Sequence, residues 1–173
     1  MTMNRFRTTG LPASIRGTLP THLDASATTP PHRPRLLLVD DEPRVLASLQ
    51  EMLKGSGYAI TTADSGTAAL ACLAEQRFDL VLLDLLMMDV DGHQVMDFIN
   101  QHDMKADVIV VSGTVGIDSA IGALKRGAHD YLRKPFSREE LLRTVENALR
   151  QRDLQQINRR MVAALALSEK KYR

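Results

Sequence analysis

Leu80-Val81-Leu82-Leu83-Asp84 is the stretch of sequence that decides the fold. Four consecutive apolar residues are typical of a strand that is buried on both faces. Asp84 closes this run, and a loop reaching Gly92 follows it. A carboxylate at the carboxyl end of a buried parallel strand points into the crevice where open α/β sheets bind ligands. We therefore expect Asp84 to be the centre of the functional site.

Strand and helix patterns alternate five times along the chain. The predicted strands cover residues 36–39, 58–63, 80–83, 108–111 and 130–132. Helical spacing of apolar residues follows each strand, with start signals at Pro43, Ser65 and Ser137 and a stop signal at Gly127. Five strand–helix units predict an α/β fold with a doubly wound parallel sheet of five strands.

The order of the strands follows from their polarity. Strands one, three and four are apolar throughout and should be central, whereas strands two and five are more polar or shorter and should lie at the edges. This arrangement fits the flavodoxin-like order 2-1-3-4-5. In that order the first and third strands are neighbours, so Asp40 and Asp84 should lie side by side.

The two ends of the chain differ in character from residues 35–150. Residues 1–34 are rich in Thr, Pro, Arg and Ser, which predicts a disordered tail and resembles a transit peptide only weakly. Residues 151–173 continue the last helix without Pro or Gly, and Leu154, Ile157, Met161 and Leu165 recur every three or four residues. We expect a helical linker that pairs as a coiled coil in a homodimer. A surface helix that packs back on its own domain is the alternative.

Composition narrows the class of protein. The chain has 173 residues, 44% of them hydrophobic, and a formal net charge of +1, so charge favours neither nucleic acid nor an anionic membrane as a partner. Cys72 is the single cysteine, which rules out an internal disulfide and fits a reducing cytosol. No apolar run reaches the length of a membrane span. We expect a cytoplasmic protein without direct nucleic acid binding.

Polar residues gather at the predicted carboxyl edge of the sheet. Asp40 and Asp41 follow the first strand, Ser112 ends the fourth, and Lys134 follows the fifth. Together with Asp84, these carboxylates would repel one another unless cations compensate, and hard oxygen ligands suit Mg²⁺. A carboxylate acceptor with a metal ion, a lysine and a hydroxyl is what phosphoryl transfer needs.

Residues 35–150 resemble the receiver domain of two-component response regulators. The matching pieces, in chain order, are Val39-Asp40-Asp41-Glu42, Asp84 with Met87 and Asp91-Gly92, Ser112-Gly113, and Tyr131-Leu132-Arg133-Lys134-Pro135-Phe136. The resemblance implies a receiver that takes a phosphoryl group from a histidine kinase or a phosphotransfer protein onto Asp84. It implies a signalling module rather than an enzyme.

The resemblance also assigns roles to the other site residues. Asp41 would bind Mg²⁺ directly, Asp40 would bind it through water, and the Asp84 carboxylate and the backbone carbonyl of Leu86 would add further ligands. Lys134 would pair with the acceptor and then with the phosphoryl group. Ser112 would turn toward that group, and Tyr131 would follow Ser112, although a static packing role for this edge-strand tyrosine stays open.

Two features lie outside the core of the resemblance. Met88 stands where the family usually has Pro, which removes a residue that would preset the loop backbone. The end of the chain, Leu167 to Arg173, resembles the lead-in to PAS sensor domains, which predicts an output module beyond it, such as a PAS domain, a histidine kinase or a diguanylate cyclase.

The same residues fit three other functions less well. A haloacid-dehalogenase phosphatase would need a second Asp two residues after its nucleophile, but Asp40 is followed by Asp41 and Glu42. A flavin-binding domain would need a phosphate-cradling loop after the first strand, where these acids would repel phosphate. DNA binding has little support, because no helix-turn-helix pattern follows and the arginines of the linker can face solvent.

Overall fold

The computed structural model describes residues 32–113 and 117–171. The chain divides into two units, residues 1–32 and residues 33–173. Most of the predicted disordered tail, residues 1–31, lies outside the described residues. The prediction is wrong for its last two residues, because the Arg33 guanidinium donates hydrogen bonds to the Gly57 and Tyr58 carbonyls and the Pro34 carbonyl accepts one from the Ala59 N–H. Everything below concerns the second unit.

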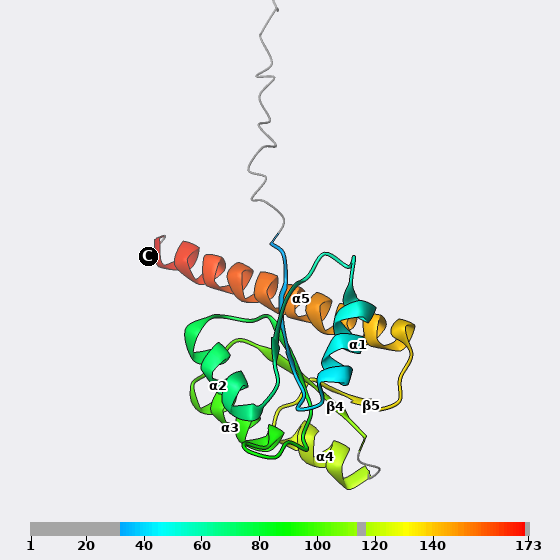
Figure 1. Ribbon diagram of the computed structural model, residues 1–173. Coiled ribbons are helices and arrows are strands. Elements are labelled where there is room, and N and C mark those ends of the chain that lie inside the picture. The colour runs from blue at the N-terminus through cyan, green and yellow to red at the C-terminus, as the bar shows by residue number, and fades with distance from the viewer. Residues whose placement is uncertain (1–31, 114–116, 172–173) are drawn as a thin grey trace, which may run out of the picture. The chain divides into compact units, whose positions relative to one another are not determined.

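This unit alternates strands and helices along its whole length (Figure 1). The elements are β1 (Arg35–Val39), α1 (Pro43–Leu53), β2 (Ala59–Ala63), α2 (Gly66–Glu75), β3 (Leu80–Leu83), α3 (Gly92–Gln101), β4 (Asp107–Ser112), α4 (Ile117–Lys125), β5 (Asp130–Arg133) and α5 (Arg138–Lys171). The strands form one sheet in the order β2-β1-β3-β4-β5, with every neighbouring pair parallel. The flavodoxin-like fold and its strand order are confirmed.

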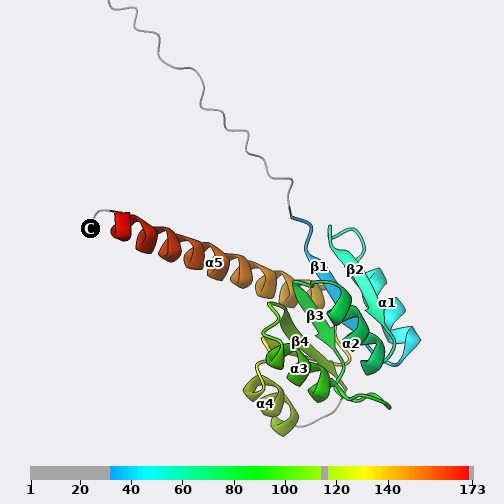
Figure 2. The same cartoon turned by 90° about the vertical axis from the view of Figure 1, so that its left-hand side faces the viewer.

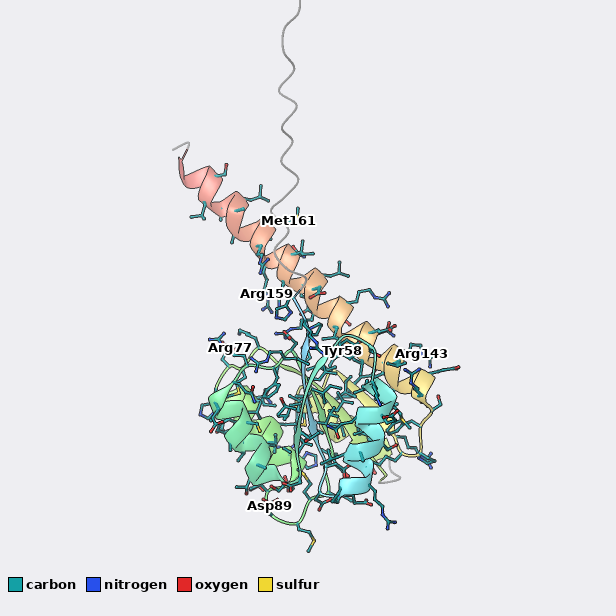
Figure 3. All side chains as sticks on the ribbon, turned by 45° about the horizontal axis from the view of Figure 1, so that its top comes forward. Tyr58, Arg77, Asp89, Arg143, Arg159 and Met161 are labelled. Atoms are coloured by element: carbon teal, nitrogen blue, oxygen red, sulfur yellow. The ribbon has the colours of Figure 1, made fainter. Side chains whose placement is uncertain are left out.

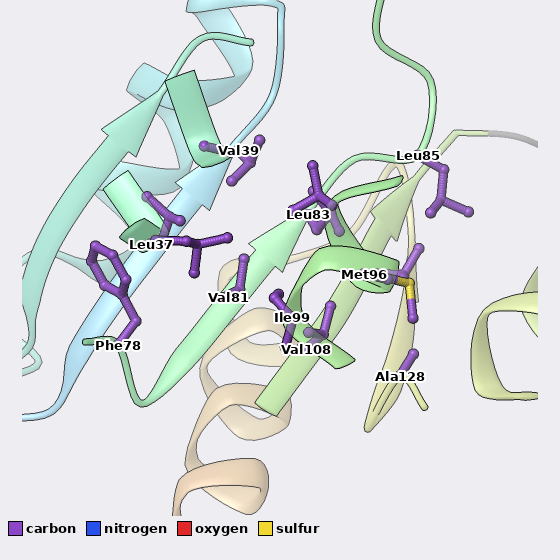
Figure 4. Close-up of a cluster of buried hydrophobic side chains, with 14 of the residues drawn as sticks. Leu37, Val39, Phe78, Val81, Leu83, Leu85, Met96, Ile99, Val108 and Ala128 are labelled. Carbon is purple, nitrogen blue, oxygen red and sulfur yellow. The ribbon is translucent and has the colours of Figure 1, made fainter. Parts of the chain in front are cut away.

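Helices cover both faces of the sheet. The side chains of Leu36 and Leu38 pack with buried residues of α1 and α5, whereas Leu37 and Val39 pack with buried residues of α2, α3 and α4. Figure 4 shows part of this second cluster. Strands β1, β3 and β4 contribute to both clusters, which is why their sequences are continuously apolar.

Local signals in the sequence set the helix boundaries. Pro43 is the first residue of α1, where its missing N–H costs nothing. The Ser65 hydroxyl accepts a hydrogen bond from the Ala68 N–H at the start of α2, and the Ser137 hydroxyl accepts one from the Glu140 N–H at the start of α5. Gly127, with a φ of +96°, follows α4 in the left-handed conformation that favours glycine.

Helix α5 runs without interruption for 34 residues and leaves the sheet part-way along its length (Figure 2). Leu141, Val145 and Leu149 are buried against the sheet and α1, whereas Ile157 and Leu165 are 53% and 66% exposed. The predicted long C-terminal helix is confirmed, and its distal part is not packed back onto the hydrophobic core. Among the described helices, none combines the length and apolar character needed to cross a membrane.

Candidate functional site

The carboxyl ends of β1 and β3 bring two aspartates together. Val39 and Leu83 are register partners, and the Asp84 N–H donates a hydrogen bond to the Val39 carbonyl at 2.9 Å. Asp40 and Asp84, the next residue of each strand, are therefore neighbours, as the strand order predicted. Both residues are buried, with exposed fractions of 1% and 7%. Two adjacent buried carboxylates need a compensating positive charge.

Lys134 supplies that charge. Its Nζ lies 2.5 Å from Oδ2 of Asp40 and 2.8 Å from Oδ2 of Asp84, so one ammonium group bridges the two carboxylates. Lys134 follows β5, and its backbone N–H donates to the Ser112 carbonyl at 2.9 Å, which ties the end of β5 to the end of β4. The Lys134–Pro135 peptide bond is cis. The lysine thus reaches across β4 from the edge of the sheet.

The pKa values of two members of this cluster reflect their burial and pairing. Burial raises the pKa of Asp40 above its usual value, against the opposing effects of the Lys134 ammonium and the Glu42 N–H. Burial alone would lower the pKa of Lys134, but the hydrogen bonds to Asp40 and Asp84 outweigh it and raise the pKa. The lysine is therefore charged at neutral pH and held between its two partners.

Each carboxylate uses its second oxygen to accept a backbone hydrogen bond. The Glu42 N–H donates to Oδ1 of Asp40 at 2.9 Å, and the Leu86 N–H donates to Oδ1 of Asp84 at 3.1 Å. One oxygen of each group thus faces the loop that follows its strand, and the other faces Lys134. Both carboxylates are held in fixed orientations.

The β3–α3 loop beside Asp84 is fastened to the start of α2. The Asp89 carboxylate accepts hydrogen bonds from the backbone N–H groups of Gly66 and Thr67, at 3.2 and 3.1 Å. The Thr67 side-chain hydroxyl, followed by backbone N–H groups, holds the pKa of Asp89 far below its usual range. Figure 3 shows Asp89 at the end of the folded unit that is remote from the distal part of α5. Asp89 therefore anchors a loop that lacks the proline usual at the Met88 position.

Two glycines allow this loop to approach closely. A Cβ atom on Gly66 would lie 2.0 Å from the Val90 carbonyl oxygen, and one on Gly92 would lie 2.3 Å from the Asp84 carbonyl oxygen. Neither contact is tolerable, so both positions need glycine. The roles of Asp89 and Gly66 could not be predicted from the sequence, because a carboxylate and a glycine in polar segments carry only a general turn signal.

The predicted metal ligands are oxygen donors of the right kind. Asp41 is partly exposed beside Asp40, and the Leu86 backbone lies next to Asp84. Within the two described ranges, no group of three His, Cys, Asp or Glu side chains gathers at metal-binding spacing. Mg²⁺ usually takes one or two carboxylates and keeps several waters, so a set of two acids with a carbonyl oxygen fits this ion better than a closed protein cage.

The two predicted switch residues lie on the adjacent strands. Ser112 ends β4 and is fully buried, with an exposed fraction of 0%. Tyr131 lies in β5, is partly buried, and packs against the cluster between the sheet and α2–α4. The structure thus brings Asp40, Asp84 and Lys134 into direct contact and places Ser112 and Tyr131 on the strands beside them.

Comparison with known proteins decides the family. The sequence model for the response regulator receiver domain matches residues 36–146, well over half of the chain. The chain belongs to this family. It is the receiver domain of a two-component response regulator, joined to a long C-terminal helix. Membership removes the support for the phosphatase and flavin-binding alternatives.

Named relatives and solved structures agree with this assignment. The transcriptional regulatory protein PrrA of Mycobacterium tuberculosis is 40% identical over 119 residues, which are 69% of this chain and 51% of PrrA. The nitrogen assimilation regulatory protein NtrX of Azorhizobium caulinodans is 35% identical over 116 residues, which are 66% of this chain and 26% of NtrX. The chain therefore spans about half of the length of PrrA and about a quarter of NtrX.

Similar structures include isolated receiver domains. The signal receiver domain of a putative LuxO repressor protein from Vibrio parahaemolyticus matches with a TM-score of 0.70 and 30% identity, covering 72% of this chain and 96% of that one. The beryllofluoride-activated receiver domain of DrrB matches with a TM-score of 0.63 and 27% identity, covering 68% of this chain and 98% of that one. DrrB comes from Thermotoga maritima.

Proposed function

We propose that this receiver accepts a phosphoryl group from a histidine kinase or a phosphotransfer protein on Asp84, and relays the change through α5. The observation that carries the proposal is the single ammonium group of Lys134 between the buried carboxylates of Asp40 and Asp84. A lysine so placed can leave one carboxylate and neutralise an incoming phosphoryl oxygen without moving far. Family membership supports the same reaction.

The reaction forms one bond and breaks one. A carboxylate oxygen of Asp84 attacks the phosphorus of a phosphohistidine, and an O–P bond replaces the N–P bond. The imidazole nitrogen leaves with the electron pair of the N–P bond and takes a proton from solvent. Asp84 Oδ2 accepts the Lys134 ammonium hydrogen bond, which can be exchanged for one to a phosphoryl oxygen, so it is better suited to attack than Oδ1, which accepts the Leu86 N–H.

The neighbouring residues stabilise the transferred group. Lys134 would exchange its hydrogen bond to Asp84 for one to a phosphoryl oxygen, and the Ser112 hydroxyl would donate a second. Tyr131 lies in the next strand and would follow Ser112 into the space that the serine leaves. Such a change at the β4–β5 edge acts directly on α5, which begins four residues after Lys134.

Mg²⁺ is the proposed cofactor. Asp41 would hold it directly, Asp40 would hold it through water, and the Asp84 carboxylate and the Leu86 carbonyl would add further oxygens. When bound, the ion supplies positive charge against the transferring phosphoryl oxygens. Asp40 also keeps Lys134 in position, because it shares that ammonium group with Asp84.

The distal part of α5 is proposed to pair with the same helix of a second copy. Leu154, Ile157, Met161 and Leu165, here called the apolar stripe, are each more than half exposed. Four large exposed apolar side chains along three turns are unusual for a free helix. Light scattering with and without beryllofluoride tests this relay. A change in mass is expected, and an unchanged mass over a wide concentration range would contradict it.

Beryllofluoride binding tests the acceptor site itself. This ion mimics an acyl phosphate only where an aspartate, Mg²⁺ and a lysine converge. Fluorine NMR should show saturable, Mg²⁺-dependent binding to the wild-type protein and none to Asp84→Asn. Asp107→Asn is a matched control, because Asp107 lies at the start of β4 and not at this site. Equal binding to the wild type and to Asp84→Asn would refute the proposal.

A further inference from the structure

Helix α5 leaves the sheet at Arg152. Its Nε lies 3.5 Å from Oδ1 of Asp79, and its Nη1 lies 3.7 Å from Oδ2 of Asp107. The arginine side chain is only 13% exposed, although it follows the last buried apolar residue of the helix, Leu149, by less than one turn. The linker arginines can face solvent by their sequence pattern, but the Arg152 side chain does not. A partly buried arginine between two acids indicates a structural role for this residue.

The two aspartates are built into the frame of the sheet. The Asp79 carboxylate accepts the Arg35 N–H at 2.8 Å, and the Asp79 N–H donates to the Arg35 carbonyl at 2.8 Å. The Asp107 N–H donates to the Asp79 carbonyl at 3.1 Å. These bonds join the starts of β1, β3 and β4. Arg152 thus forms ion pairs with two aspartates that are fastened to the sheet, at the edge opposite the acceptor site, although its buried Nε has no hydrogen-bond partner among the described residues.

The position of Arg152 on the helix determines where the apolar stripe points. At 3.6 residues per turn, Met161 lies about 180° around the helix from Arg152, and Leu154 and Leu165 lie within about 40° of Met161. Arg159 lies on the side of Arg152, and both line a groove with Lys105 and Asp107. One side of the helix therefore faces its own receiver, and the apolar stripe faces away. Figure 3 labels Arg159 and Met161 on this part of α5.

We infer that Arg152 locks the tail helix, residues 150–171 of α5, in one orientation that presents the apolar stripe to a second copy of this chain. In this role Arg152 is a positioning residue that acts through the helix. Without the contacts to Asp79 and Asp107, the helix is held by the core only as far as Leu149. The exposed part could then bend, and the stripe could turn back toward its own receiver.

Two copies of the apolar stripe can pack against each other, because no like charges oppose one another beside it. In a parallel pair with Leu154 and Met161 at the a positions, Asp153 faces Asn158 of the partner subunit, and Arg160 faces Leu165 of the partner subunit. No like charges oppose one another at these flanking positions. The orientation of the tail helix by Arg152 is a property of a single chain. The pairing of two tail helices rests on the proposed function.

Distances within one chain test the lock. Spin labels on Glu75→Cys in the receiver and Ala166→Cys in the tail helix, in a Cys72→Ala background, report the orientation of the helix. Ala166 lies on the side away from the apolar stripe, so its label does not block pairing. Dilution with unlabelled protein leaves only the distance within one chain.

The lock predicts a narrow distance distribution that becomes several-fold broader in Arg152→Met. Asp107→Asn should also broaden the distance distribution. This second variant tests the lock independently if Arg152→Met folds poorly. Arg150→Met is the matched control, since Arg150 is exposed and bonds only to Asn147 among the described residues. Distributions that stay narrow in both lock variants would overturn the inference.

Light scattering on the same proteins separates the two proposals. Weaker association of Arg152→Met, by several-fold and with an intact stripe, supports the presentation of the stripe to a second copy. A wild-type chain that stays monomeric but whose distance distribution still broadens in Arg152→Met would keep the lock and refute the homodimer. Wild-type association with no change in Arg152→Met would refute the role of Arg152 in pairing.

Discussion

The two edges of the sheet carry the same set of charges. At the carboxyl edge, Lys134 bridges Asp40 and Asp84, which follow β1 and β3. At the amino edge, Arg152 bridges Asp79 and Asp107, which stand at the starts of β3 and β4. Each cluster has two acids and one base. We propose that one cluster performs chemistry and the other holds a helix, so the difference must come from geometry.

Distance and burial separate the two clusters. The contacts at the carboxyl edge are 2.5 and 2.8 Å, and the Asp40 side chain is 1% exposed. Those at the amino edge are 3.5 and 3.7 Å, and the Asp107 side chain is 31% exposed. A buried, tightly bridged pair of carboxylates responds strongly to a new charge, whereas a pair with longer contacts and more solvent responds less and can serve to position a helix.

Magnesium affinity should show the largest difference between the edges. Asp41→Ala should abolish measurable Mg²⁺ binding, because Asp41 is the proposed direct ligand. Asp40→Ala should weaken binding by about 10–100-fold, the usual loss for a group that acts from the outer shell. Asp107→Ala at the amino edge should leave the affinity unchanged. Titration calorimetry measures all three, and equal losses in the two site variants would refute the ranking of Asp41 above Asp40.

Removal of the bridging base should cost more stability at the carboxyl edge. Lys134→Met leaves two adjacent buried carboxylates unpaired, so we expect a loss of about 3 kcal/mol in the free energy of unfolding at neutral pH. Arg152→Met should cost only about 1 kcal/mol, because water reaches its partners. Urea denaturation without Mg²⁺ measures both. Equal losses of unfolding free energy in the two variants would mean that the difference in burial does not set the strength of the two clusters.

The pH dependence follows from the directions of the pKa shifts. The folded pKa of Asp40 is raised, so its charged form costs stability above that pKa, and the cost fades as the pH falls through it. The contribution of Lys134 is complete below its unfolded pKa of 10.5 and is lost only as the pH rises through the raised folded value. The destabilisation caused by Lys134→Met should therefore shrink toward acidic pH. A loss that grows on acidification would contradict this assignment.

Leu86 is the site of the smallest predicted effect. It stands two residues after the acceptor and is 66% exposed, and its side chain cannot orient an attacking water. Leu86→Asn or Leu86→Glu should speed the loss of phosphate from Asp84 several-fold, within the range of positioned polar groups, with little change in phosphorylation by the donor. Decay of labelled phosphoprotein measures this rate. Unchanged decay in both variants would assign Leu86 to loop packing alone.

The positions that could be predicted from the sequence were those with a strong local pattern. Apolar runs of four residues between helical patterns are typical of central strands, so Leu80–Leu83 indicated the sheet and the place of Asp84 at its edge. Strand order predicted that Asp40 and Asp84 are neighbours, and the family resemblance implied the pairing of Lys134 with Asp84, whereas the contact of Lys134 with Asp40 was not predicted. The fold and the set of residues that meet at the carboxyl edge could thus be derived before the structure was known.

Residues whose role depends on three-dimensional proximity were missed. Asp89 binds backbone N–H groups more than 20 residues away, and Gly66 is required only because the β3–α3 loop passes over it. Arg152 resembles other linker arginines in the sequence and differs only in the two acids that lie beneath it. None of these contacts has a periodic or spacing signal, because each joins segments whose separation is set by the whole fold.

The assignment of Asp84 as the phosphoryl acceptor is tested most directly by intact mass. After incubation with acetyl phosphate and Mg²⁺, mass spectrometry should detect one phosphoryl adduct on the wild type and on Asp107→Asn. Asp84→Asn should remain folded by circular dichroism and carry no adduct. An adduct retained on Asp84→Asn would contradict the account, and so would its absence from a folded wild-type protein.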